Sequence, residues 1–196
     1  EADLAVHSLK DLPIEDQKDT LIVSMLERAD SRDILFLKKD IFENYNNKEL
    51  RILTSSPRRV YNFSNFLESL LPFNPKRITF EDVRGNIPTR LKKLLHGDCQ
   101  GLIVAKAAID RLISYGNKDV SDKIQSYLDD LLWMIIPLSL NPCAPGQGAI
   151  AVEVNSKRKD IIELINKINH IETFSQVIKE REILQNYGGG CHQKIG

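Results

Sequence analysis

Residues 51–59 read RILTSSPRR, a short apolar run that ends in hydroxyl residues, a proline and two arginines. Ser56 suits the cap of a helix and Pro57 suits its first position, so the stretch predicts a strand followed at once by a helix. Backbone N–H groups and the positive end of the helix dipole face outward at such a turn, where Arg58 and Arg59 add bidentate donors. The turn therefore predicts an anion site, with an ordinary capped helix and solvated arginines as the alternative.

The same alternation of strand and helix patterns runs along the rest of the chain. Strands are expected at 4–6, 21–25, 51–53, 77–80, 102–105 and 149–154, and helices at 58–71, 87–95, 107–115 and 157–168. Several of these strands are apolar throughout, as strands buried on both faces are. The pattern predicts an α/β chain with a mostly parallel sheet.

Two segments are expected to separate two lobes. The charged link 28–32 and the proline-bearing segment 137–142 predict one lobe from 1–28 with 138–168, and a second from 29–137, joined by two crossings. The chain opens in what looks like the middle of a strand and stops soon after a last amphipathic helix. We therefore expect both ends to be cut.

The composition excludes several classes of protein. A chain of 196 residues, 42% hydrophobic and 28% charged, is typical of a soluble globular protein. Its 27 basic residues balance 27 acidic ones, so no global field draws it to nucleic acid or membrane, and no apolar stretch would span a bilayer. Cys99, Cys143 and Cys191 lack the spacing of a disulfide framework or a zinc site, and the scattered histidines predict no metal site.

A second strand-to-helix turn repeats the arginine pattern in VRGNIPTR, residues 83–90. Gly85 permits close approach to the backbone, while Arg84 and Arg90 flank the start of the next helix. In open α/β sheets ligands bind at the carboxyl ends of the strands, where both turns are expected. The coincidence predicts a site for a ligand with several negative charges.

Polar residues also follow the first strand, in VHSLKDLP at 6–13. A carboxylate such as Asp11 can stabilise a cation or move a proton there, and Lys10 can hold an anion. The alternative is a turn capped by Asp11, with Lys10 in solvent. We expect His7 to be structural and to be satisfied by a hydrogen bond.

Two glycine-bearing segments complete the candidates. In APGQGA, residues 144–149, Gln147 can both donate and accept hydrogen bonds. In GGGC, residues 188–191, the Cys191 thiol follows backbone that bends freely, which suits a covalent attachment point. A small buried hydrophobic cysteine is the alternative.

Taken together and in order, VHSLKDLP, TSSPRR, VRGNIPTRL, APGQGA and GGGCHQKIG resemble the porphobilinogen deaminase family. The resemblance covers essentially the whole chain, with Pro57 and the polar His192-Gln193-Lys194 as departures. It implies two lobes like those of periplasmic binding proteins, with mixed, mostly parallel sheets. It also implies that 169–196 begins a small α+β third domain and that Cys191 carries a dipyrromethane cofactor through a thioether.

The resemblance further implies a transferase of heme and tetrapyrrole biosynthesis. Such a hydroxymethylbilane synthase joins four porphobilinogen units head to tail, releases ammonia each time, and yields linear hydroxymethylbilane. We expect a cytoplasmic monomer without a nucleic-acid or membrane partner.

Roles for individual residues come from the same resemblance. Asp11 is the expected catalytic residue, because a carboxylate near the pyrrole nitrogens would stabilise the cations formed when ammonia leaves. The carboxylates of the cofactor and the growing chain would be held by Lys10, Thr54, Ser56, Arg58, Arg59, Arg84, Gly85, Asn86, Arg90 and Gln147.

Two other functions stay open on the sequence. A non-enzymatic, two-lobed anion-binding protein would explain the arginines, but would need neither Cys191 nor Asp11. A cysteine-nucleophile enzyme would use the thiol, yet no recognised partner pattern accompanies it beyond the adjacent His192. An organic chromophore on Cys191 would separate the deaminase interpretation from both.

Overall fold

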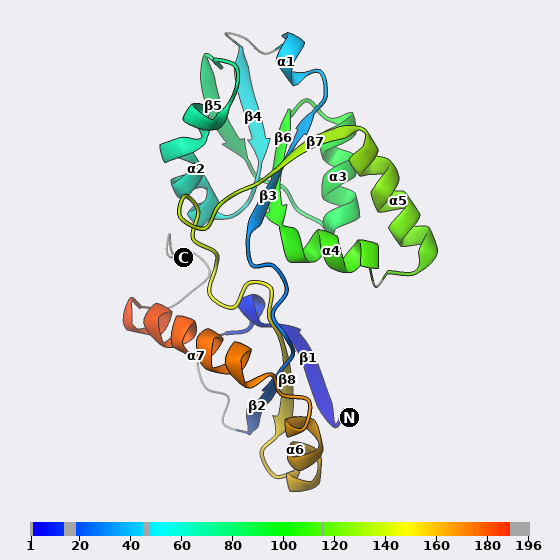
Figure 1. Ribbon diagram of the computed structural model, residues 1–196, viewed down its shortest axis with the longest axis vertical. Helices are drawn as coiled ribbons and strands as arrows, with labels where there is room; N and C mark the ends of the chain where they lie inside the picture. Colours follow the sequence, from blue (N-terminus) through cyan, green and yellow to red (C-terminus); the bar gives the residue numbers. More distant parts are fainter. Residues whose placement is uncertain (1, 14–18, 45–47, 115, 189–196) are drawn as a thin grey trace. The chain divides into compact units, whose positions relative to one another are not determined.

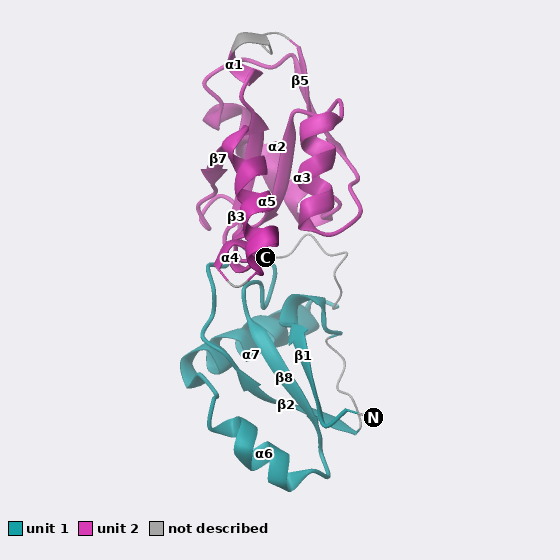
Figure 2. Ribbon diagram, turned by 90° about the vertical axis from the view of Figure 1, so that its right-hand side faces the viewer, with its two compact units in different colours: residues 1–31, 143–195 teal, residues 32–142, 196 magenta. Residues whose placement is uncertain are grey.

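A computed structural model of the chain describes residues 2–13, 19–44, 48–114 and 116–188. The chain divides into two compact units (Figure 2): unit 1 contains residues 1–31 and 143–195, and unit 2 contains residues 32–142. The chain therefore passes between the units twice, after Ser31 and after Pro142. The domain limits expected from the sequence, including a third domain from residue 169, stay predictions.

Unit 1 is built on a three-stranded antiparallel sheet with the order β1-β8-β2 (Figure 1). Its strands are β1 (Leu4–Ser8), β2 (Thr20–Met25) and β8 (Ile150–Asn155). Its helices are the 3-10 helix η1 (Leu9–Asp11), α6 (Lys159–Asn166) and α7 (Ile171–Asn186). The buried core of the unit contains Leu9, Met25, Ala149, Ala151 and Val177.

Unit 2 is built on a five-stranded mixed sheet with the order β5-β4-β6-β3-β7. Its strands are β3 (Asp33–Lys38), β4 (Glu49–Leu53), β5 (Arg77–Glu81), β6 (Gly101–Ala105) and β7 (Leu131–Ile135). Its helices are α1 (Ile41–Asn44), α2 (Pro57–Leu70), α3 (Ile87–His96), α4 (Lys106–Ser114) and α5 (Lys118–Asp129). None of the helices in the described ranges combines the length and the apolar character needed to cross a bilayer.

Strand β3 shows why unit 2 has a core on each side of its sheet. Successive side chains of a strand point to opposite faces, so Ile34 and Phe36 join one cluster while Leu35 and Leu37 join the other. The first cluster includes residues of α3, α4 and α5, and the second includes Phe63 and Leu67 of α2 (Figure 1). The sheet is thus buried on both faces, as its apolar strands predicted.

The strand directions correct one expectation. The sheets are mixed, but only the pairs β4–β5 and β4–β6 are parallel, while β3 runs antiparallel to β6 and β7, and β8 antiparallel to β1 and β2. Parallel neighbours need a long crossover, usually a helix, and α2 and α3 provide it for β4, β5 and β6. The described sheets are therefore less parallel than the sequence pattern indicated.

Sequence reasoning also missed β3, β7, α1 and α5. Both strands are short apolar runs beside the predicted crossings, and periodicity alone does not separate such a run from a buried helical turn or a link. Their pairing in one sheet is a long-range property, because β7 lies nearly a hundred residues after β3 in the sequence.

Candidate functional site

The turns after β4 and β5 lie side by side in unit 2. Ser55 Oγ donates a hydrogen bond of 2.7 Å to the carbonyl oxygen of Val83, and Val83 N–H donates one of 2.9 Å back to Ser55 Oγ. One residue earlier, Thr54 N–H donates to the carbonyl oxygen of Glu81 at 2.8 Å. The structure thus brings both arginine-bearing turns together at the carboxyl ends of β4 and β5.

The turn after β5 presents its polar groups to solvent. Asn86 caps α3, since its Oδ1 accepts the Thr89 N–H at 3.0 Å, and Arg90 Nε donates to the Gly85 carbonyl oxygen at 2.7 Å. Gly85 has φ +116°, and a Cβ there would lie 2.8 Å from Thr89 Cγ2, so the position requires glycine. Within the described residues the exposed Arg84 guanidinium makes no hydrogen bond or ion pair. The Arg84 side chain is thus exposed to solvent, and anion binding by this turn stays a prediction.

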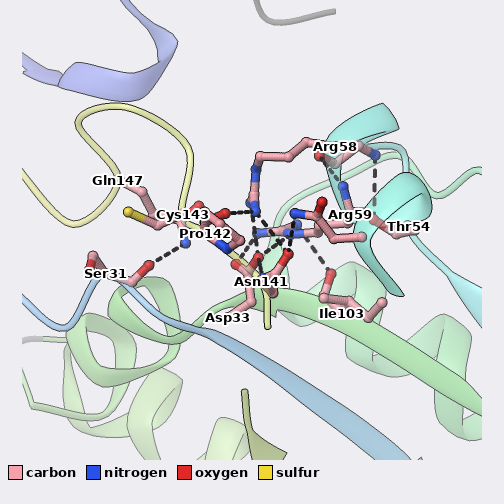
Figure 3. Close-up of polar contacts among 12 residues, drawn as sticks. Ser31, Asp33, Thr54, Arg58, Arg59, Ile103, Asn141, Pro142, Cys143 and Gln147 are labelled. Carbon is pink, nitrogen blue, oxygen red and sulfur yellow. Dashed lines mark hydrogen bonds and ion pairs between the residues drawn. The ribbon is translucent and has the colours of Figure 1, made fainter. Parts of the chain in front are cut away.

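The two arginines of the first turn lie instead in a buried cluster around Asp33 (Figure 3). Arg58 and Arg59 are 3% and 7% exposed, and Asp33 is 1% exposed. Arg59 donates two hydrogen bonds to the Asp33 carboxylate, from Nε at 3.0 Å and from Nη2 at 2.6 Å, and Arg58 Nη2 donates a third at 2.9 Å. Burial acts to raise the pKa of Asp33, but the two guanidiniums and the Asn141 amide hold that pKa well below its usual range.

The other donors of these arginines also point into unit 2. Arg58 Nη1 donates to Asn141 Oδ1 at 3.0 Å and to the carbonyl oxygen of Pro142, while Arg59 Nη1 donates to that of Ile103 at 3.3 Å. The cluster ties the start of α2 to β3, β6 and the segment that leaves the unit. Two guanidiniums share one carboxylate, so the described contacts leave an excess of one positive charge. A direct bond from Arg58 or Arg59 to a ligand carboxylate stays a prediction.

The hydroxyl residues of the first turn shape the backbone. Ser56 is the cap of α2, because its Oγ accepts the Arg59 N–H at 3.4 Å, and Pro57 occupies the first turn. Thr54 is 2% exposed, and its Oγ1 accepts the Ser56 N–H at 3.4 Å. The helix start predicted from the sequence is confirmed, while ligand binding by Thr54 and Ser56 stays a prediction.

In unit 1, Lys10 and Asp11 lie on η1, directly after β1. Asp11 is exposed and Lys10 is half-buried. Leu9 is fully buried, and its N–H donates to the Ala149 carbonyl oxygen at 3.1 Å, which anchors the start of η1. His7 has the partner expected for a structural histidine, since its Nε2 lies 2.8 Å from Glu153 Oε2.

The glycine-bearing loop of unit 1 buries Gln147, which is 1% exposed. Its side-chain Nε2 donates to the Ser31 carbonyl oxygen at 2.6 Å, and its backbone carbonyl oxygen accepts a hydrogen bond from Arg28 Nε at 3.0 Å. Gly146 and Gly148 on either side have φ +72° and +89°. Gln147 therefore stabilises the chain within unit 1, and contact with a cofactor stays a prediction.

Cys191, the predicted attachment residue, lies outside the described residues. Of the triglycine, Gly188 is described, with φ +91° just after α7. Cys99 is buried, and burial together with a hydrogen bond to Glu81 raises the pKa of its thiol to about 11. That thiol is therefore poorly suited to act as a nucleophile near neutral pH.

Sequence reasoning missed Asp33 and Asn141, which neutralise and orient the buried arginines. One signal was available for Asp33, because a carboxylate that opens an apolar strand must find a cation when it is buried. No local pattern marks Asn141, which meets the cluster only through the return of the chain after β7.

Comparison with known proteins adds a family match. A family model described as "Porphobilinogen deaminase, dipyromethane cofactor binding domain" matches residues 1–163. The porphobilinogen deaminase of Syntrophomonas wolfei is 36% identical over 199 residues, which cover 100% of this chain and 56% of that protein. The porphobilinogen deaminase of Caldicellulosiruptor saccharolyticus is 37% identical over 196 residues, covering 100% of this chain and 60% of that protein. The chain thus spans less than two thirds of the length of these relatives.

Solved structures give a weaker likeness. An arginine-transport periplasmic binding protein from Legionella pneumophila is 16% identical with a TM-score of 0.37, covering 92% of this chain and 72% of that chain. No conclusion about function follows from a likeness of this size.

Proposed function

Because the chain belongs to the porphobilinogen deaminase family, we propose that it carries part of the machinery that joins four porphobilinogen units into linear hydroxymethylbilane. The family match over residues 1–163 carries this proposal, and it includes Asp11, both arginine-bearing turns and Gln147. The reaction is a transferase step of tetrapyrrole biosynthesis that releases ammonia for each unit added. We expect the protein to act as a monomer in the cytoplasm, without a nucleic-acid or membrane partner.

The donor set of unit 2 fits a dipyrromethane cofactor. Each pyrrole ring of such a group carries an acetate and a propionate, and its carboxylates need cationic donors. Arg84 is exposed beside Gly85 and Asn86, at the start of α3, where the helix dipole also favours negative charge. Each charge-assisted hydrogen bond would contribute about 1.5–3 kcal/mol. We assign the first carboxylate contacts to this turn, with Arg90 supporting it through the Gly85 carbonyl group.

Arg58 and Arg59 would act on the same carboxylates mainly through charge. Their described donors are engaged inside unit 2, where the described ion pairs set two guanidiniums against one carboxylate. A buried positive charge is weakly screened, so it would raise the electrostatic potential at the carboxyl ends of β4 and β5, where the two turns lie. Thr54 and Ser56 would hold the backbone of that edge in place.

Asp11 would supply the electrostatic part of the reaction. When bound, a dipyrromethane would supply the terminal pyrrole ring to which the first substrate unit is joined. Porphobilinogen becomes cationic as its ammonia leaves, and the Asp11 carboxylate would stabilise that charge and accept the proton released from the attacking ring carbon. Lys10 beside it would hold a carboxylate of the substrate, and Gln147 would support the cofactor cleft from its loop.

The intact mass of the full chain tests the proposal directly. Wild type and the control Cys143→Ser should carry an added mass that matches a dipyrromethane, whereas Cys191→Ser should have only its polypeptide mass. If wild type has only its polypeptide mass, and keeps it after incubation with porphobilinogen, the deaminase proposal is wrong and a non-enzymatic anion-binding protein becomes the better interpretation.

A further inference from the structure

Arg181 of α7 donates hydrogen bonds to backbone carbonyl groups on both sides of Asp11. Its Nη1 donates to the carbonyl oxygens of Leu9 at 3.3 Å and of Leu12 at 3.2 Å, and its Nη2 donates to that of Pro13 at 2.5 Å. The planar guanidinium presents its donors in a rigid fork, which a flexible ammonium group cannot reproduce. One side chain thus holds three carbonyl groups of the segment that carries the candidate catalytic carboxylate.

Besides Arg181, the described restraints on the Asp11 segment are the bond from Leu9 N–H to the Ala149 carbonyl oxygen, the packing of Leu9 and Leu12 in the core of unit 1, and the turn itself. η1 is a single turn closed by the bond from Leu12 N–H to the Leu9 carbonyl oxygen at 3.1 Å. The exposed Asp11 carboxylate itself has no hydrogen bond or ion pair with any described residue. The place of that carboxylate therefore depends on the backbone, and the backbone carbonyl groups are held from α7.

Helix α7 is held against the rest of unit 1 by hydrogen bonds and an ion pair, so the position of Arg181 is well defined. Glu180 pairs with Arg28 through two bonds of 2.6 and 2.9 Å, and its Oε2 also accepts the Gly146 N–H at 2.9 Å. Near the start of the helix, Thr173 Oγ1 accepts the Arg28 N–H at 3.1 Å. Burial acts to lower the pKa of Arg28, but the hydrogen bonds and negative charge of Glu180 raise that pKa above its usual value, so the guanidinium is charged.

We propose that Arg181 is a positioning residue for Asp11. By fixing the carbonyl groups of Leu9, Leu12 and Pro13, its guanidinium sets where the Asp11 carboxylate stands when a cation forms beside it. The catalytic consequence rests on the proposed function, while the backbone contact stands apart from it. The helix that positions Asp11 is also the one whose end leads, a few residues later in the sequence, to Cys191.

The test compares Arg181→Met, which keeps the apolar stem, with Arg181→Lys and with the control Lys179→Met in the full, cofactor-loaded chain. Lys179 is an exposed cation of the same helix without a described partner. We expect Arg181→Met to lower kcat by up to about 100-fold, as small misplacements of catalytic groups do, with little change in KM. Arg181→Lys should restore part of the loss, and Lys179→Met should match wild type.

Two further measurements separate positioning from a general loss of structure. Amide hydrogen exchange over residues 4–12 should be faster in Arg181→Met but unchanged in Lys179→Met. In an Asp11→Glu background, Arg181→Met should cost much less than in wild type, because both changes act on one carboxylate. Unchanged exchange, or an equal loss of kcat in both backgrounds, would overturn the inference.

The failure of the proposed function has a different signature. Full activity of Asp11→Asn would refute the catalytic role of Asp11, and with it the catalytic part of this inference. The exchange measurement would still decide whether Arg181 holds the segment.

Discussion

The two arginine-bearing turns of unit 2 look alike in sequence and differ in structure. Each follows a parallel strand, opens a helix with a capping side chain and carries arginines. Yet Arg58 and Arg59 are buried around Asp33, while Arg84 is exposed and without a described partner. An arginine at a helix start therefore becomes an internal cation when a buried carboxylate lies within its reach, and otherwise stays exposed, as Arg84 does.

Removing that carboxylate should have the largest effect. Asp33→Asn removes the described counter-charge of two buried guanidiniums, so we expect the free energy of unfolding to fall by about 3–5 kcal/mol. Urea unfolding of Asp33→Asn against the exposed control Asp82→Asn checks this. If both variants unfold at the same urea concentration, the buried cluster does not stabilise the fold.

Acid should weaken the same cluster progressively. The folded-state pKa of Asp33 is lowered, so unfolded chains bind more protons at this group, and its stabilisation is present above its ordinary pKa of about 4 and lost as the pH falls. The urea midpoint of wild type should therefore drop between pH 6 and pH 3 more steeply than that of Asp33→Asn. Parallel pH profiles would show that other carboxylates dominate acid unfolding.

A change in the exposed turn should affect ligand binding and leave the stability of the fold nearly unchanged. Arg84→Met should change the free energy of unfolding by less than about 0.5 kcal/mol, because the side chain is exposed. It should nevertheless weaken the binding of a dipyrromethane or a porphobilinogen oligomer by about 10- to 100-fold, the value of one charge-assisted bond.

Titration of the two ligands into Arg84→Met and the exposed control Lys76→Met, measured by calorimetry, checks the prediction. Equal affinities for both variants would show that Arg84 does not bind the ligand and would favour Arg58 and Arg59 as the groups that attract its carboxylates. A marked loss of stability in Arg84→Met would instead erase the contrast between the two turns.

Much of the fold was readable from short stretches. The alternation of strand and helix, the capped start of α2 and the glycine at 85 follow from residues within a few positions of one another. The apolar run of β3 was equally local, but its pairing with β6 and β7 was not. For the site, sequence reasoning placed both turns at one edge of the sheet but did not find Asp33, Asn141 or Arg181.

What the sequence determined by itself is local. Ser56 and Asn86 cap helices through bonds to N–H groups three residues ahead, and such bonds form wherever the surrounding chain lies. Whether each arginine is buried or exposed depends on the tertiary structure. Arg58 reaches an aspartate 25 positions earlier and an asparagine 83 positions later. Burial removes water from such groups, so only partners that the fold brings within reach can satisfy them, and the tertiary structure decides which arginines become internal cations.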